Sequence, residues 1–270
     1  MKATVLVDNV SANGICGEWG LCVYIEHKGK KILLDSGSSD LFTENAKKLG
    51  IDLKKVDYGV LSHAHYDHAN GIPAFLDLNK KAKFYISSNT EENCFHFVKV
   101  RHHYIGIPKN LLSDHKKRLV PVDQVTEISD GVWVVPHSTK GLELVGEKSR
   151  MYKRYGRNYI PDDFSHEQSL VIETESGLVI FNSCSHSGPE VIVAEVKKAF
   201  PGKKITAYVG GLHLYARNND DILLVADKLK KTGVKKIYTG HCTGGRAYGI
   251  LKEQLGERVQ PLECGLVMEF

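Results

Sequence analysis

No stretch of this sequence approaches the ~20 consecutive apolar residues that a membrane-spanning helix needs. The apolar stretch within residues 1–8 is too short for a secretory signal, and we expect a first strand there. Charge of one sign is also scarce, since 36 basic and 32 acidic residues leave a net charge of +4. We therefore expect a cytoplasmic protein without a membrane partner, and we disfavour nucleic acid as a partner.

Cysteine pairs of the Cys-x-x-Cys kind are missing. The cysteines are spread along the chain, at Cys16, Cys22, Cys94, Cys184, Cys242 and Cys264. This spacing excludes a zinc-ribbon or thioredoxin-like motif. In a chain of this size we expect reduced thiols rather than a disulfide framework. Cys184 and Cys242 stand apart, because each lies beside a candidate metal histidine.

Internal repeats and low-complexity linkers are absent as well. The composition, 42% hydrophobic and 25% charged, is that of an ordinary globular protein. We therefore predict a single domain over residues 1–270. Two segments, near 89–120 and 140–165, show no sustained period and are candidate lid or substrate insertions, because long loops in compact domains are often functional. The alternative is a solvated excursion with scattered histidines.

Apolar periodicity elsewhere predicts a mixed α/β chain. Expected strands lie at 1–8, 21–26, 31–35, 56–61, 83–87, 131–135, 169–174, 177–183, 204–209, 235–239 and near 259–269. Expected helices lie at 41–49, 72–78, 189–199, 220–231 and 246–256. Gly50 is a typical helix end for the first of these.

The densest group of candidate metal ligands follows directly after the apolar run 56–61. His63, His65, Asp67 and His68 fall within six residues. Imidazole and carboxylate ligands suit zinc, and also iron or manganese. In a turn after a strand, the first two histidines can point at one ion while Asp67 and His68 reach a second, as in a two-metal hydrolytic site. The alternative is a charged loop, which gives no reason for this spacing.

Further histidines follow strand-like runs. The candidates are His63, His186, His213 and His241, after 56–61, 178–183, 205–209 and 236–239. Strand carboxyl ends in α/β proteins meet at one edge, where sites form. Four histidines delivered to that edge favour a metal centre over four unrelated surface residues.

The His-x-His-x-Asp-His motif after a strand resembles the signature of the metallo-β-lactamase superfamily. The paired strands at 20–25 and 31–37, with their Asp-x-Gly turn, resemble the opening of that fold. Three later motifs, 184–188, 210–214 and 240–244, resemble the branch of dihydropterin ribofuranosyl-aminobenzene phosphate synthase-like metal-dependent hydrolases. The resemblance covers nearly the whole chain. It implies a four-layer αββα sandwich of two mixed sheets.

The resemblance also implies a set of ligands. His63, His65 and a later histidine, for which we choose His186, would hold one metal, and Asp67, His68 and His241 the second. Cys184 stands where the superfamily has a bridging aspartate, so the second metal's occupancy is open; Cys184 is either a thiolate ligand or a small buried residue. Asp35 is a possible ligand, but we favour a structural role for its carboxylate, as a hydrogen-bond partner of the ligands. We expect two divalent ions, zinc first, with manganese, magnesium or iron as alternatives.

The run 149–159 interleaves cations with aromatic residues. Arg150, Tyr152, Arg154 and Arg157 are candidates to stack a flat ring and bind a phosphate. A basic loop in solvent is an equal alternative.

We hypothesise a metal-dependent hydrolase or transferase. Metal-bound hydroxide, oriented by Asp67, would attack a phosphorylated small molecule, and His213 would assist the leaving group. The resemblance implies a pterin- or ribosyl-phosphate-like substrate and allows a synthase reaction. The rivals are a phosphodiesterase or RNA-processing nuclease, and a non-catalytic metal- or ligand-binding protein on the same fold. His65, where a redox di-iron branch would have Glu, argues against oxygen chemistry. No pattern predicts an oligomeric state.

Overall fold

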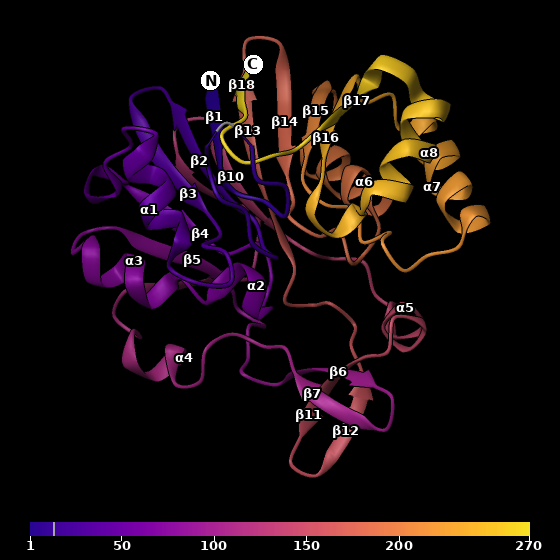
Figure 1. The fold of residues 1–270 in the computed structure, drawn as a ribbon, viewed down its shortest axis with the longest axis horizontal. Coiled ribbons are helices and arrows are strands. Elements are labelled where there is room, and N and C mark those ends of the chain that lie inside the picture. The colour runs from indigo at the N-terminus through magenta and orange to yellow at the C-terminus, as the bar shows by residue number, and fades with distance from the viewer. Residues whose placement is uncertain (13) are drawn as a thin grey trace.

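A computed structural model describes residues 1–12 and 14–270, and two seven-stranded sheets form its centre (Figure 1). The first sheet has, in spatial order, β18 (Val267–Glu269), β1 (Lys2–Val7), β2 (Cys22–His27), β3 (Lys30–Leu34), β4 (Tyr58–Val60), β5 (Lys83–Ser87) and β8 (Leu119–Val122). The second has β17 (Val259–Pro261), β16 (Lys236–Thr239), β15 (Ile205–Val209), β14 (Gly177–Phe181), β13 (Gln168–Thr174), β10 (Val132–Pro136) and β9 (Thr126–Ser129).

Both sheets are mixed. In the first, β3, β4, β5 and β8 run parallel to one another, and in the second β14, β15, β16 and β17 do. The other neighbouring strands are antiparallel. The parallel strands explain the near-continuous apolar runs of the sequence, because a strand covered on both faces is apolar at successive positions.

Helices cover the outer face of each sheet, as Figure 1 shows. On the first sheet these are α1 (Leu41–Lys48), α2 (Tyr66–Ala69), α3 (Ile72–Leu78) and α4 (Leu111–Asp114). The second sheet carries α6 (Pro189–Ala199), α7 (Asn219–Thr232) and α8 (Gly245–Leu255). The short helix α5 (Glu143–Lys148) lies directly before β11 (Met151–Tyr155), a strand of the small sheet described below. Among the described helices, none is long and apolar enough to cross a membrane.

Strand parity places the core. On β2, Val23 and Ile25 belong to the core between the sheets, whereas Tyr24 packs with Phe42 of α1 and Phe75 of α3. The same alternation on β14 directs Val179 and Phe181 inward, and Leu178 and Ile180 toward α6, α7 and α8. The layers are therefore helix, sheet, sheet, helix, which confirms the predicted αββα sandwich.

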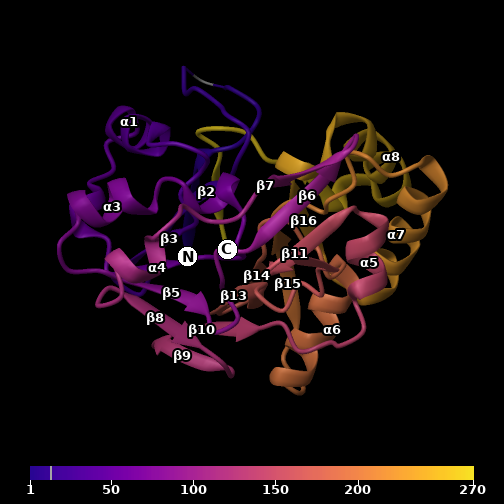
Figure 2. The ribbon, with the colours of Figure 1, turned by 90° about the horizontal axis from the view of Figure 1, so that it is seen from below.

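A third, four-stranded sheet was not predicted. This small sheet has the order β12 (Asn158–Pro161), β11 (Met151–Tyr155), β6 (Cys94–Val98), β7 (Arg101–Tyr104), so each unpatterned segment supplies one hairpin. In Figure 1 it lies below the two large sheets, and Figure 2 looks up at it. Its strands carry aromatic and basic residues on the exposed face as well, which removes the apolar alternation that signals a strand. The candidate lid or substrate insertions near 89–120 and 140–165 thus form one small sheet, and their role as a lid stays a prediction.

Candidate metal centre

The predicted metal residues come from strand ends of both large sheets. Asp35 follows β3, His63 follows β4, Cys184 follows β14, His213 follows β15 and His241 follows β16. Because parallel strands deliver their carboxyl ends to one edge, these side chains meet between the sandwich and the small sheet.

The first donor group is His63, His65 and His186. Their donor nitrogens lie within 4.8 Å of one another, and the rings are 4.7 to 4.9 Å apart between centroids. His65 occupies the N-cap position of α2 without a capping hydrogen bond from its ring, and α2 turns the chain shortly after β4. Glu167 holds the backbone of His186 in place, because its carboxylate accepts hydrogen bonds from the backbone N–H groups of His186 and Ser187 at 2.8 and 3.0 Å.

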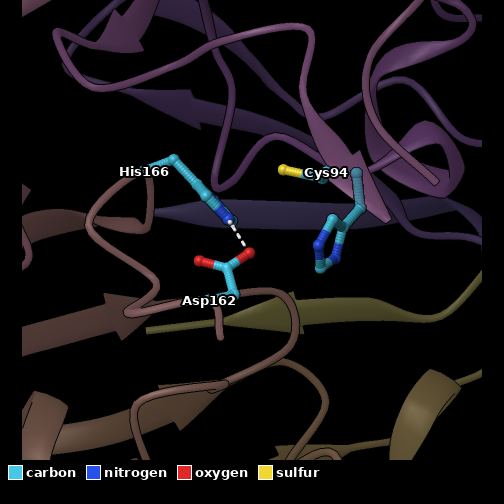
Figure 3. A group of neighbouring side chains, drawn as sticks. Cys94, Asp162 and His166 are labelled. Carbon is cyan, nitrogen blue, oxygen red and sulfur yellow. Dashed lines mark hydrogen bonds and ion pairs between the residues drawn. The ribbon is translucent and has the colours of Figure 1, made fainter. Parts of the chain in front are cut away.

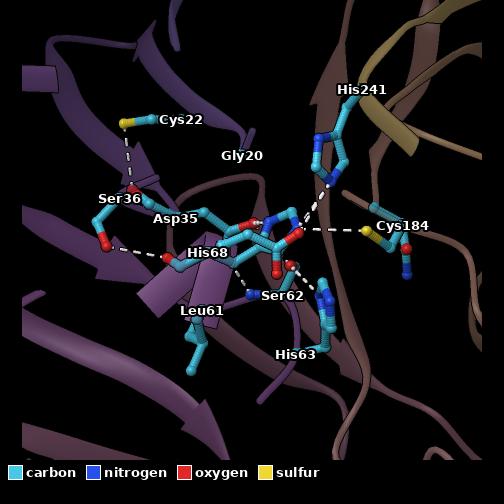
Figure 4. A network of polar contacts seen from close by, with 12 residues as sticks. Gly20, Cys22, Asp35, Ser36, Leu61, Ser62, His63, His68, Cys184 and His241 are labelled. Atoms are coloured by element: carbon cyan, nitrogen blue, oxygen red, sulfur yellow. Dashed lines mark hydrogen bonds and ion pairs between the residues drawn. The ribbon is translucent and has the colours of Figure 1, made fainter. Parts of the chain in front are cut away.

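The second donor group is Asp67, His68 and His241, and Figure 4 labels its two histidines. The Oδ2 atom of Asp67 lies 3.6 Å from Nε2 of His68 and 3.4 Å from Nε2 of His241. The two Nε2 atoms are 3.2 Å apart. Gly20 is required here, since a Cβ at that position would come within 2.6 Å of the backbone oxygen of Asp67.

The hydrogen-bond network assigns the histidine tautomers. Nδ1 of His68 donates to Oδ2 of Asp35 at 2.8 Å, and Nδ1 of His63 donates to Oγ of Ser62 at 2.9 Å, which in turn donates to Asp35. Nδ1 of His241 donates to Oδ1 of Asn9 at 3.0 Å. Each Nε2 therefore presents a lone pair to the site, as metal-ligating histidines do.

These residues fit a metal centre. The Nε2 atoms of His63 and His65 and both ring nitrogens of His186 are buried and have no hydrogen-bond partner among the described residues. The Nε2 atoms of His68 and His241 lie 3.2 Å apart, a separation that requires a proton or a metal cation between them. A buried unpaired polar atom costs about 1–3 kcal/mol, so the arrangement calls for a ligand that accepts lone pairs.

Cys184 lies between the two donor groups. Its Sγ is 3.2 Å from Nε2 of His68, and its donor atom also belongs to clusters with His63 and with His186. This is where a bridging ligand would be. Cys242, which the motif analysis did not assign to the metal, clusters with Cys184 and His241, and the backbone N–H of His213 donates to its Sγ at 3.3 Å.

Backbone strain is concentrated at this site. Asp35, Ser185, His213 and His241 have φ angles of 58°, 55°, 49° and 47°, in the left-handed region that non-glycine residues rarely adopt. Such residues persist when the surrounding structure holds them, and they cluster at functional sites.

Burial and charge set the protonation states. Burial and the neighbouring histidines lower the pKa of His65 to about 3 and hold the pKa values of His63 and His186 well below the usual range. Burial also lowers the pKa of His241, but Cys242 and Asp67 outweigh it and raise that pKa to about 9. Burial raises the pKa of Asp67, but His68 and His241 outweigh it and lower it below its usual range. The first donor group is therefore neutral, and the second attracts positive charge.

A cavity of about 190 Å³ opens onto both donor groups. Its lining includes His65, Asp67, Cys184, His186 and Cys242 on the donor side. His213 lines it too, with its ring 4.3 Å from that of His186, and its Nδ1 meets no hydrogen-bond partner in the part of the chain that the structure describes. His213 is thus free to contact a bound group.

The predicted ring- and phosphate-binding run does not reach this cavity. On β11, Met151 and Lys153 face the body of the protein, whereas Tyr152 and Arg154 face the other side. Arg150 lies over the ring of Phe97, and Arg157 is exposed at the hairpin turn. Cavity contacts come instead from Met151 and from His96, its partner on β6. Alternate side chains of a strand point to opposite faces, which keeps Tyr152 and Arg154 away from this cavity, and their role in substrate binding stays a prediction.

A buried cluster beside the first donor group was also missed (Figure 3). Nε2 of His166 donates to Asp162 at 3.1 Å, and the backbone N–H of Ala64, between the two metal histidines, donates to Nδ1 of His166 at 3.1 Å. Cys94 and His65 complete the cluster. It ties the end of the small sheet to the metal turn. The i, i+4 spacing of Asp162 and His166 was the only signal in the sequence.

The fold is that of the αββα sandwich class, and its two donor groups are sets of side chains that could hold divalent metal. Residues 20–149 match the Metallo-beta-lactamase superfamily. A Methanocaldococcus jannaschii protein named 7,8-dihydropterin-6-methyl-4-(beta-D-ribofuranosyl)-aminobenzene-5'-phosphate synthase is 31% identical in an alignment of 262 positions. This alignment covers 92% of this chain and 88% of that protein. The chain belongs to the metallo-β-lactamase superfamily, whose members include metal-dependent hydrolases.

Solved structures agree with this assignment. Tm1679, described as a metal-dependent hydrolase of the beta-lactamase superfamily, matches with a TM-score of 0.83 at 28% identity and covers 100% of this chain and 99% of its own. A diphosphatase from the PhnP family matches with a TM-score of 0.58 at 17% identity over 100% and 97% of the two chains, which is a likeness of fold alone.

Proposed function

We propose that the protein is an enzyme that uses two divalent ions, zinc first, to hydrolyse or transfer a phosphorylated small molecule. The first donor group would hold one ion and the second donor group the other, with Cys184 between them. The observation that carries the proposal is the set of buried imidazole nitrogens of His63, His65 and His186, which have no hydrogen-bond partner among residues 1–12 and 14–270.

The bound ions would supply Lewis acidity at a phosphoryl oxygen and at a water. Asp67 would accept a hydrogen bond from that water and orient it, since its carboxylate lines the cavity. His213 would donate a proton from its ring to the leaving group, because it also lines the cavity and its Nδ1 meets no partner among the described residues. The small sheet would exclude bulk water as a lid on a single domain.

The substrate class comes from the relatives. The Methanocaldococcus jannaschii protein is named as a synthase of a ribofuranosyl phosphate carrying a pterin. A phosphorylated, pterin- or ribosyl-like substrate is therefore our choice here, and a transfer reaction that releases pyrophosphate is the variant of it. The nuclease rival lacks support, because Arg150, Arg154 and Arg157 do not line the cavity.

A reducing compartment such as the cytoplasm would suit this centre. Cys184 and Cys242 are buried and free, and their donor atoms lie within 4.8 Å of each other. An oxidising compartment would join them and remove Cys184 from the metal.

The test is elemental analysis of protein purified without added metal, beside a double variant, His65→Ala with Asp67→Ala. About two ions per chain, lost in the variant, are expected. His103→Ala, at an exposed position on β7, is the control and should keep both ions. One ion in the wild type would indicate a mononuclear centre, and none after reconstitution would overturn the proposal. A phosphate- and pyrophosphate-release screen then separates hydrolase from synthase.

A further inference from the structure

Exposed aromatic side chains gather at the mouth of the metal cavity. Among the described residues, four aromatic side chains are strongly exposed: Trp19 (41%), Tyr66 (36%), Tyr155 (45%) and Tyr215 (43%). All of these except Tyr155 line the cavity. Exposed aromatic surface costs free energy in water, so its concentration at a single place indicates a binding role.

The rings are held in place rather than loose. Trp19 and Tyr215 meet edge to face, with centroids 5.5 Å apart and planes at 77°, and Trp19 also lies 5.2 Å from the ring of His241. The backbone N–H of Tyr215 donates to the carbonyl of Cys242 at 3.1 Å. Rings fixed in this way lose little conformational entropy when a ligand binds.

The loop of Trp19 is anchored on both sides. Glu18 accepts the backbone N–H groups of Ser38 and Ser39 at 2.9 and 3.1 Å. The backbone N–H of Gly20 donates to Oδ1 of Asn9, the same oxygen that accepts Nδ1 of His241. Asn9 therefore couples the position of Trp19 to that of a proposed metal ligand.

The cavity has two chemically different ends. One part of its lining holds histidines, Asp67 and thiols, and the other part holds the three rings with His96, Ile105 and Met151 of the small-sheet region. At about 190 Å³ it is smaller than the roughly 300 Å³ at which pockets for drug-sized ligands begin. It therefore has room for a phosphoryl group and one adjoining group, with the remainder of the substrate at the rings.

We propose that the substrate carries a planar, uncharged aromatic ring beside its phosphoryl group, and that Trp19, Tyr66 and Tyr215 bind this ring. The proposal rests on the proposed function for the phosphoryl end. Aromatic cages also bind cationic ammonium groups, but a cation here would lie next to two divalent ions and be repelled. A flat ring gains stacking contacts that a puckered ring cannot make.

The experiment compares two non-hydrolysable anions with the metal-loaded enzyme by calorimetry. Benzylphosphonate and cyclohexylmethylphosphonate share the head group and differ in whether the ring is planar. We expect the planar ligand to bind wild type about tenfold more tightly, the scale of one stacking contact. The preference should fall to about twofold in Trp19→Ala and Tyr215→Ala, and stay unchanged in Tyr155→Ala, a matched exposed tyrosine outside the cavity. Equal affinities in wild type would overturn the proposal.

A second probe separates this inference from the proposed function. Pterin, a flat ring without phosphate, is titrated against Trp133→Phe, which leaves Trp19 as the fluorophore, and against Trp19→Phe, which leaves Trp133 packed on Phe200. Saturable quenching in the first variant alone supports the ring site even when neither phosphonate binds, in which case only the phosphoryl assignment fails. No quenching of Trp19 by pterin overturns the ring site, and so do phosphonate affinities that are measurable and equal.

Discussion

The two donor groups share one cavity but neutralise charge in different ways. The first, His63, His65 and His186, offers neutral imidazoles, and burial lowers the pKa of each. The second contains Asp67, and its His68 donates a hydrogen bond to Asp35. This group attracts positive charge strongly enough to raise the pKa of His241 to about 9. Two ions of equal charge would therefore meet different electrostatic potentials at the two positions. Metal affinity at the second position should depend on the carboxylate charge, and at the first on the placement of the three histidines.

Asp67→Asn should break this asymmetry most severely. The variant keeps the shape but removes the charge that lies 3.4 Å from His241 and 3.6 Å from His68. We expect loss of the second ion and a fall in phosphoester turnover of at least about 100-fold. Removing a residue that only hydrogen-bonds to a metal ligand costs up to about 100-fold, and here a proposed ligand itself is removed. Metal content per chain and turnover are the measurements. Loss of both ions together would show that the two positions are not independent.

Asp35→Asn and Glu167→Gln sharpen the comparison as a matched pair. Asp35 accepts the proton-bearing nitrogen of His68, and Glu167 accepts the backbone N–H of His186. We expect Glu167→Gln to weaken the first ion by about 10- to 100-fold, and Asp35→Asn to weaken the second by as much. The first ion should respond less to Asp35→Asn, because Asp35 reaches His63 only through Ser62. Competition with a chelator of known affinity measures both ions. If the two variants weakened the same ion most, the assignment of the groups would be wrong.

Cys184→Asp tests the bridge with a smaller effect. A thiolate favours zinc over manganese and magnesium, whereas a carboxylate suits all three. We expect about a tenfold shift of preference from zinc toward manganese, and loss of sulfur-to-metal charge-transfer absorption from the cobalt-substituted protein. Cys264→Ser, a buried cysteine outside both donor groups, is the control. An unchanged cobalt spectrum in Cys184→Asp would show that Cys184 is not a ligand.

The sequence predicted the parts of the molecule that obey a short period. Helices α3 and α6 were placed at their observed bounds, because apolar residues recur on one face. The His63–His68 motif needs no tertiary information, since its ligands lie on one turn. The resemblance supplied the sandwich, which strand periodicity alone leaves as a mixed α/β class.

The rest depends on tertiary contacts. The rings at the cavity mouth come from a glycine-rich loop, from α2 and from the loop after β15, and no local pattern marks Trp19 or Tyr215. His96 on β6 reaches the cavity and Arg154 on β11 does not. Strand parity decides both positions, and these strands were not predicted. Asn9 is equally isolated, and only its bond to His241 reveals a role.

The smallest expected effect on the site comes from a buried histidine–carboxylate pair outside it. His137 at the end of β10 lies 3.0 Å from Glu195 of α6, which also accepts the backbone N–H groups of Ser138 and Thr139 at 2.9 and 2.7 Å. Burial raises the pKa of Glu195, but these hydrogen bonds outweigh it and hold the pKa at about 2. Burial likewise lowers the pKa of His137, but Glu195 outweighs it and raises that pKa above its usual value of 6.5.

The sign of the pH dependence follows from these shifts. The contribution of Glu195 is present above pH 4.5 and is lost as the pH falls toward 2. The contribution of His137 is complete below pH 6.5 and is lost as the pH rises through its folded pKa. We therefore expect Glu195→Gln to lower stability most between pH 4.5 and 6.5, by roughly 3 kcal/mol or about 5–10 °C in Tm, with metal content unchanged. Glu257→Gln, which removes an exposed ion pair with Lys252, is the control and should leave Tm unchanged at every pH. A loss of metal in Glu195→Gln would contradict this prediction. It would mean that the His137–Glu195 pair stabilises the metal centre from a distance.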